Sequence, residues 1–202
     1  AIDCIHTAAA SHGRVFIVEA MGHKVGSLTL HAGIAGGADI ILIPEIPYDI
    51  KKVIAAIDRR TKQGKRFTIL AVAEGAISKE DAKLSKKKYK EKLAARAKKY
   101  PSVSYEIADR ISKETGNEVR ITVPGHTQRG GTPGAYDRVL STRIGAGAAE
   151  AIIDEEYGVM IGIVNGKIKR IPLAECAGKL KMVSPKDQTV KAAKQIGISF
   201  GD

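Results

Sequence analysis

The chain has 202 residues, of which 44% are hydrophobic and 27% are charged, a composition typical of a folded globular protein rather than a disordered one. No apolar run approaches the roughly 20 residues that a membrane-spanning helix needs, so the sequence predicts no membrane partner. Two cysteines are too few for a disulfide framework and have no zinc-binding spacing, so we expect a reducing, cytoplasmic setting.

Residues 1–128 alternate short apolar runs with amphipathic stretches. In chain order, the predicted elements are a strand at 15–21, a helix at 25–36, a strand at 39–44, a helix from its N-cap Asp49 to Gly64, a strand at 67–73, a charged helix at 79–99, a helix at 104–116 and a strand at 119–123. Unbroken apolar strands are typical of parallel sheets that helices cover on both faces. The alternation therefore predicts a three-layer α/β/α sandwich with a mainly parallel sheet.

The pattern changes after Gly131. A long helix is predicted here, with Thr132 as its N-cap and Pro133 at its first helical position. The side chains expected to face inward from it are Val139, Leu140 and Ile144. Strands at 159–164 and 167–172 are joined by Asn-Gly, the strongest short hairpin signal in the chain. The C-terminal residues are expected to be helical.

The formal net charge of +11 raises the possibility of nucleic-acid binding. Residues 79–99 hold ten Lys or Arg against three acids, so this one segment carries +7 of the total. The apolar positions on one helical stripe of this lysine-rich segment are Ala82, Tyr89, Leu93, Ala97 and Tyr100. We favour a solvated helix resting on a domain surface over a nucleic-acid interface, because the chain has no Trp and only 4% aromatic residues on which bases could stack.

Candidate binding residues follow the predicted strands, because ligands of open α/β sheets bind beyond the carboxyl ends of the strands. The residues at these ends are Met21, Gly22, His23, Glu45, Glu74, Gly125, His126 and Arg129. Cations that bind a phosphate and carboxylates that accept hydrogen bonds from hydroxyls suit a phosphorylated polyol. The glycines and helix start at 129–134 add an anion site.

Each candidate also has a structural interpretation. Position alone does not choose between Glu45 and Glu74, since either could cap a helix or lie on the surface. His126 could be a hydrogen-bonded core histidine, and Arg14 and Arg120 could belong to structural ion pairs. No phosphate-binding P-loop, GxGxxG turn or GxSxG elbow is present, so three common enzyme classes lack their signature.

Several motifs resemble those of the phosphofructokinase family. One is the segment Gly125–Pro133 (GHTQRGGTP), followed by Tyr136-Asp137-Arg138. The others, in the same order and spacing as in the family, are Ser11-His12-Gly13-Arg14, Val18–Gly22, Ala32–Gly37 and Ala71–Gly75. The resemblance covers most of the chain, is weakest in the lysine-rich segment, and corresponds to the C-terminal, fructose 6-phosphate-binding part of bacterial 6-phosphofructokinases.

The resemblance implies two α/β/α domains with Rossmann-like sheets. The implied activity is that of the glycolytic kinase, which transfers a phosphoryl group from ATP to the 1-hydroxyl of fructose 6-phosphate and forms fructose 1,6-bisphosphate. A pyrophosphate-dependent enzyme and a non-catalytic sugar-phosphate-binding fragment remain alternatives. The runs at 31–39 and 43–47 resemble a bacterial branch that includes both donor types, so they leave the donor open.

By motif, His126 and Arg129 would hold the 6-phosphate of the sugar from their own subunit. Arg14 and Arg120 would reach that phosphate from a neighbouring subunit, which implies a homo-oligomer, a dimer or a tetramer. The resemblance thus adds two arginines that the strand-end rule did not select.

By motif, Glu74 would bind the hydroxyls of the sugar, and Met21 and Gly22 would line it, so the resemblance favours Glu74 over Glu45. His23 stands where the family usually has Arg and is a possible contact to the transferring phosphoryl group. A neutral imidazole would stabilise that charge less than a guanidinium does.

The family's glycine-rich donor loop and its Thr-Ile-Asp-Asn-Asp-like segment have no counterpart in the chain. Magnesium with ATP or pyrophosphate is therefore expected on an N-terminal half, which becomes an expected partner, and no metal ligand is predicted here. We expect the chain alone to be inactive. The expected domains are 1–128 for the sugar phosphate, 129–180 as a crossover helix and hairpin of the incomplete donor domain, and 181–202 as a tail returning to the first.

Overall fold

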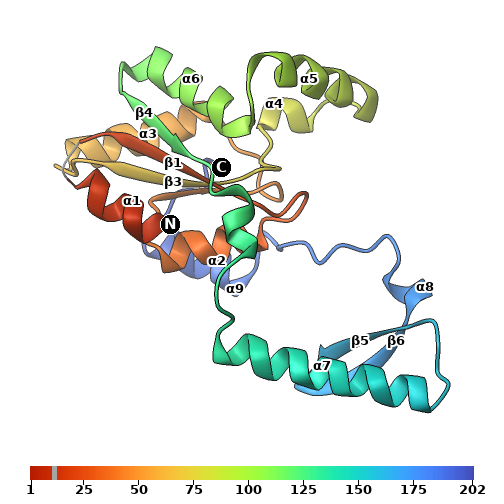
Figure 1. Ribbon diagram of the computed structural model, residues 1–202. Helices are drawn as coiled ribbons and strands as arrows, with labels where there is room; N and C mark the ends of the chain where they lie inside the picture. Colours follow the sequence, from red (N-terminus) through yellow and green to blue (C-terminus); the bar gives the residue numbers. More distant parts are fainter. Residues whose placement is uncertain (11–12) are drawn as a thin grey trace. The chain divides into compact units, whose positions relative to one another are not determined.

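The computed structural model describes residues 1–10 and 13–202 (Figure 1). It divides into two compact units, one formed by 1–128 with 182–202 and the other by 129–181. The two units are described separately below. Ser11 and His12, which belong to one of the motifs, lie outside the described residues.

The first unit is built on a four-stranded sheet in the order β2-β3-β1-β4. The strands are β1 (Val15–Ala20), β2 (Ile40–Leu42), β3 (Thr68–Ala73) and β4 (Val119–Thr122). All three strand pairs are parallel, and Val15 lies opposite both Thr68 and Val119. The prediction of a mainly parallel sheet is confirmed.

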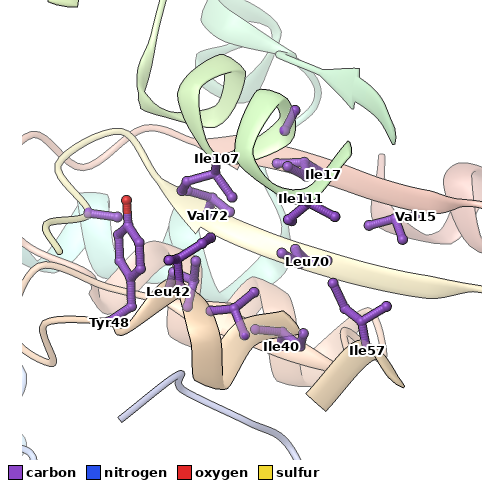
Figure 2. Close-up of a cluster of buried hydrophobic side chains, with 14 of the residues drawn as sticks. Val15, Ile17, Ile40, Leu42, Tyr48, Ile57, Leu70, Val72, Ile107 and Ile111 are labelled. Atoms are coloured by element: carbon purple, nitrogen blue, oxygen red, sulfur yellow. The ribbon is translucent and has the colours of Figure 1, made fainter. Parts of the chain in front are cut away.

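Helices cover both faces of this sheet (Figure 1). One face packs against α3 (Ile50–Lys62) and α6 (Val103–Thr115), and the other against α1 (Ile2–Ala9), α2 (Ser27–Ala35) and α9 (Gln188–Gln195). Figure 2 shows the first of these cores, where side chains of β1, β2 and β3 meet α3 and α6. The predicted three-layer sandwich is confirmed.

Alternation along β1 divides its side chains between the two cores. Val15 and Ile17 point to the core drawn in Figure 2, and Phe16 and Val18 point to the other. A strand that is apolar on both faces must be covered on both faces, because burial of each such side chain removes apolar area from water. This is the physical reason why the unbroken apolar runs predicted central parallel strands.

Helix boundaries follow local capping signals. The Asp49 carboxylate accepts a hydrogen bond from the Lys51 amide at 2.9 Å and starts α3, as predicted. α6 ends at Gly116, whose φ of +70° lies in the left-handed region. The C-terminal tail returns to the sheet, where the Ile41 amide donates to the Ser199 carbonyl at 2.8 Å beside the outer strand β2.

The lysine-rich segment forms two helices, α4 (Lys79–Ala82) and α5 (Lys86–Lys99). The chain breaks between them because the Ser85 hydroxyl accepts from the Lys88 amide at 3.4 Å and starts a new helix. The prediction of one continuous stripe was therefore wrong for Ala82, which ends α4. α1 was not predicted at all.

The second unit consists of α7 (Ala135–Ile153), the hairpin β5 (Val159–Val164) and β6 (Lys167–Pro172), and the short α8 (Leu173–Cys176). The hairpin is confirmed, and its turn residues Asn165 and Gly166 have φ values of +49° and +75°. No helix of the described residues is long and apolar enough to cross a bilayer.

Two expectations for α7 were wrong. Its N-cap is Gly134 rather than Thr132, because the Asp137 carboxylate accepts from the Gly134 amide at 3.1 Å and fixes a later start. Val139 is 59% exposed rather than inward-facing. α7 instead approaches the hairpin through Gly147, where a Cβ atom would lie 2.8 Å from Ile168 Cγ2.

Candidate functional site

Three of the predicted segments meet at the carboxyl edge of the parallel sheet. Ala20 at the end of β1 pairs with Ala73 at the end of β3, so Met21 and Glu74 follow directly from paired residues. β4 lies on the other side of β1 and leads into the short 3-10 helix η1 (Gly125–Arg129). The topology explains why residues more than 100 positions apart in sequence reach one edge.

Glu74 holds the segment that follows β1. Its Oε1 atom accepts hydrogen bonds from the amides of Gly22 at 3.2 Å and His23 at 2.5 Å. His23 has a φ of +53°, so the turn is held in a backbone conformation that non-glycine residues seldom adopt. Within the described residues Oε2 has no hydrogen-bond partner, and because Glu74 is exposed this oxygen is free to accept from a ligand.

The turn η1 is joined to the same segment by Gln128. Its Oε1 accepts from the Met21 amide at 3.0 Å, and its Nε2 donates to the Gly125 carbonyl at 3.2 Å. His126 on this turn is exposed, which excludes its interpretation as a core histidine, and Arg129 ends the turn and is also exposed. Gln128 was not singled out from the sequence, although it lies inside the motif GHTQRGG.

Glu45 has a structural role. Both of its carboxylate oxygens accept from the Gly26 amide, at 3.0 and 3.1 Å, and Oε1 also accepts from the Val183 amide at 3.0 Å. The side chain thus ties the start of α2 to the returning C-terminal tail. Its oxygens are engaged by the backbone, in contrast to Oε2 of Glu74.

Arg14 and Arg120 lie away from this edge. Arg14 precedes β1 and its Nε atom is 2.6 Å from Glu118 Oε2, while Arg120 pairs with the other oxygen of Glu118. A strand of six residues spans about 20 Å, so Arg14 and Glu74 are at opposite ends of the sheet. Within one chain the structure does not bring these two arginines to Glu74, and it shows the ion pairs considered from sequence.

A cavity of about 810 Å³ lies beside Glu74, bounded on its other side by α5. The residues that α5 and its C-cap Tyr100 contribute to its wall are Tyr89, Leu93, Arg96, Ala97 and Tyr100. α5 has no buried residue, as expected for a solvated helix, and its apolar stripe lines this cavity. Arg96 anchors the helix by ion pairs with Asp81 at 2.8 Å and Glu106 at 2.5 Å.

The residues that the structure describes do not fit a metal site of their own. Nowhere in 1–10 and 13–202 do three His, Cys, Asp or Glu side chains come together in a group that could hold a metal ion.

The sequence of the chain is similar to those of known proteins. A sequence model of the family described as Phosphofructokinase matches residues 1–152. An ATP-dependent 6-phosphofructokinase of Spirochaeta thermophila is 47% identical over 202 residues, which cover 100% of this chain and 55% of that protein. A relative of the same name from Chloroflexus aurantiacus is 43% identical over 202 residues and is covered to 54%.

Solved structures agree in fold. The phosphofructokinase of Saccharomyces cerevisiae matches with a TM-score of 0.67 and 33% identity, over 96% of this chain and 23% of that one. A pyrophosphate-dependent phosphofructokinase of Marinobacter aquaeolei gives a TM-score of 0.70 over 98% of this chain and 54% of that one, but its 19% identity supports the fold alone. The chain spans about half the length of the curated relatives it matches. Because the family model covers well over half of its residues, the chain belongs to the phosphofructokinase family and corresponds to the C-terminal part of its members.

Proposed function

We propose that this chain is the acceptor half of an ATP-dependent 6-phosphofructokinase, the part that binds fructose 6-phosphate. The observation that carries the proposal is the Glu74 carboxylate, which binds the Gly22 and His23 amides through one oxygen and presents the other, unpartnered among the described residues, to solvent. A carboxylate fixed in this way accepts hydrogen bonds from sugar hydroxyls without first losing side-chain freedom. The curated relatives of 47% and 43% identity carry the name of this activity.

In this proposal the two ends of the sugar phosphate are bound by different segments. Glu74 accepts from the sugar hydroxyls, and Met21 and Gly22 line the ring. His126 and Arg129 bind the 6-phosphate, and both are exposed on the turn η1. In this proposal a carboxylate binds the hydroxyls of the sugar and basic side chains bind its phosphate, which is the arrangement that we expected from the residues at the strand ends.

His23 departs from the family's usual Arg at the position after Met-Gly. Its side chain is exposed and lines the cavity beside Glu74. We infer that it contacts the transferring phosphoryl group, whose charge an imidazole stabilises less than a guanidinium does. His23→Arg is therefore expected to raise turnover by the assembled enzyme at neutral pH.

The remaining parts of the reaction lie outside this chain in our proposal. Residues 129–180 belong to the donor domain, and 181–202 return to the acceptor domain. ATP with magnesium binds on the N-terminal half. Arg14 and Arg120 reach the 6-phosphate bound by a neighbouring subunit, since they lie at the edge opposite Glu74 in their own chain.

Titration calorimetry with fructose 6-phosphate tests the proposal. Glu74→Gln should weaken binding by about 1.5–3 kcal/mol, the range for a hydrogen bond to a charged group. Glu91→Gln on the exposed face of α5 is the matched control and should bind as the unaltered chain does. If the two variants bind alike, Glu74 does not contact the sugar.

The donor is tested on the assembled enzyme. Mixing the chain with an N-terminal half should restore formation of fructose 1,6-bisphosphate with ATP, and pyrophosphate should not replace it. Turnover with pyrophosphate alone would establish the alternative donor. Binding of the sugar phosphate with no turnover in either mixture would favour a non-catalytic sugar-phosphate-binding module.

A further inference from the structure

The Gln128 side chain bridges two segments that are distant in sequence. Its amide oxygen accepts from the Met21 amide at 3.0 Å across 107 positions, and its amide nitrogen donates to the Gly125 carbonyl at 3.2 Å. A backbone N–H needs an acceptor and a backbone carbonyl needs a donor, so only one orientation of the amide group satisfies both.

The two bridged segments carry opposite ends of the proposed site. Met21 is followed by Gly22 and His23, whose amides bind Glu74. Gly125 is followed by His126, on the turn that ends at Arg129. Gln128 therefore lies between the groups assigned to the sugar hydroxyls and those assigned to the phosphate.

The segment after β1 also adopts a backbone conformation that needs support from outside. His23 has a φ of +53°, in a region that non-glycine residues seldom adopt. Such a conformation persists where surrounding contacts determine it. The hydrogen bonds of Glu74 and Gln128 are the side-chain contacts that hold residues 21–23 within the described part of the chain.

We infer that Gln128 is a positioning residue that couples the phosphate-binding turn to the hydroxyl-binding segment, so that the two bind one sugar phosphate as a unit. This inference rests on the proposed function. A ligand with both groups then binds more tightly than two uncoupled subsites allow, because their relative position is fixed before the ligand arrives.

Methyl NMR of Met21 distinguishes a coupling role of Gln128 from a purely structural one, because only coupling makes the Met21 signal respond to phosphate bound at the other end of the site. The chain has three methionines, Met21, Met160 and Met182, so a methionine-labelled sample gives one signal from the site and two internal controls. Inorganic phosphate is the probe for the His126 end, and the same titration of His23→Ala removes any contribution from the imidazole next to Met21. Phosphate should shift the Met21 signal in the unaltered chain, and in Gln128→Leu it should shift the His126 ring signals while the Met21 signal stays in place.

Affinity gives the second measurement. Gln128→Leu should bind fructose 6-phosphate about tenfold more weakly, the effect of losing a hydrogen-bonded link at the site. The exposed Gln195→Ala control should stay within twofold. Gln128→Glu keeps an acceptor for the Met21 amide and loses the donor to Gly125, so it should bind with intermediate affinity, and it replaces Gln128→Leu if thermal melting shows that variant to be unfolded.

The outcomes separate this inference from the function on which it rests. If the unaltered chain does not bind fructose 6-phosphate, the proposed function fails and the inference with it. If it binds the sugar phosphate, the inference alone is overturned by a Met21 signal that ignores phosphate, by one that responds equally in Gln128→Leu, or by unchanged affinity of that variant.

Discussion

Two glycines allow backbone to pack against backbone next to Glu74. A Cβ atom at Gly75 would lie 2.0 Å from the His23 carbonyl oxygen, and one at Gly22 would lie 2.5 Å from the Val25 carbonyl oxygen. Neither neighbour is a flexible side chain that could move aside. The close approach keeps the Glu74 carboxylate within hydrogen-bonding distance of the amides of Gly22 and His23.

Gly75→Ala should displace the segment that carries His23. We expect a loss of about 1–3 kcal/mol in the free energy of unfolding, as for overpacked sites, together with weaker binding of fructose 6-phosphate. Gly145→Ala is the control, because nothing lies within 4 Å of its Cβ position inside α7 and it should be neutral or stabilising. Urea denaturation and calorimetry would measure both, and normal binding by Gly75→Ala would show that the close approach is dispensable.

Asp187 is the N-cap of α9, and its contribution to the stability of the fold depends on pH. The Thr189 amide donates to its carboxylate at 2.7 Å, and this hydrogen bond lowers the pKa of Asp187 below its usual value of 3.8. A carboxyl group whose pKa is lower in the folded chain stabilises the fold above the unfolded pKa and loses that contribution as the pH falls through the folded value.

The stability difference between the unaltered chain and Asp187→Asn should therefore shrink between about pH 5 and pH 3. Asn also caps helices well, so the comparison isolates the charge. Chemical denaturation of both proteins across this pH range would measure the difference in their free energies of unfolding. A difference that stays constant with pH would contradict a role for the ionised carboxylate.

At the scale of the elements, α5 is anchored by charged side chains. Arg96 is 11% exposed and lies between Asp81, at 2% exposure, and Glu106 at 22%. Lys92 also pairs with Asp81. The helix has no buried residue, so these charges hold in place the wall of the cavity beside Glu74.

Arg96→Gln should cost about 1.5–3 kcal/mol of unfolding free energy, since its loss leaves Glu106 without a counterion and the buried Asp81 with Lys92 alone. Arg110→Gln is the matched control. Arg110 lies 3.9 Å from Glu80, which is 74% exposed, so its loss should cost about 0.5 kcal/mol or less. Equal effects of the two substitutions in thermal or urea unfolding would mean that the Arg96 pairs do not anchor α5.

Elements with their own local signals could be predicted from the sequence. The apolar runs of β1 and β3 and the Asp49 cap of α3 act over a few residues, which is why periodicity finds them. The start of α7 was predicted wrongly because the sequence holds two competing local signals, and Asp137, which bonds the Gly134 amide, prevails over Thr132.

The site residues likewise divide into those that local sequence patterns could predict and those that they could not. Glu74 and His126 were candidates because they follow strands, and strand ends of a parallel sheet share one edge. The bridge made by Gln128 joins positions 107 apart through side-chain geometry, which no local pattern encodes.

At the scale of the whole molecule, the two units differ in how much apolar surface they bury. Both hydrophobic cores belong to the first unit. In the second unit large apolar side chains are exposed, including Tyr136 at 78%, Ile153 at 78% and Tyr157 at 73%. This exposure is what our assignment of 129–180 to an incomplete donor domain leads us to expect.

Hydrogen exchange should separate the two units. The amides of β5 and β6 should exchange faster than those of β1 and β3, because local opening costs little where few apolar contacts are buried. Addition of an N-terminal half should slow exchange in the hairpin. Equal protection of both units in the chain alone would contradict an incomplete second domain.

The contact between Ser199 and β2 covers an edge of the sheet. Ser199 accepts from the Ile41 amide and donates to the Asp39 carbonyl, beside the outer strand β2. Without this contact, the outer strand would present open hydrogen-bonding groups of the kind that recruit strands from other molecules. The segment that carries Ser199 therefore also guards this edge of the fold against edge-to-edge association.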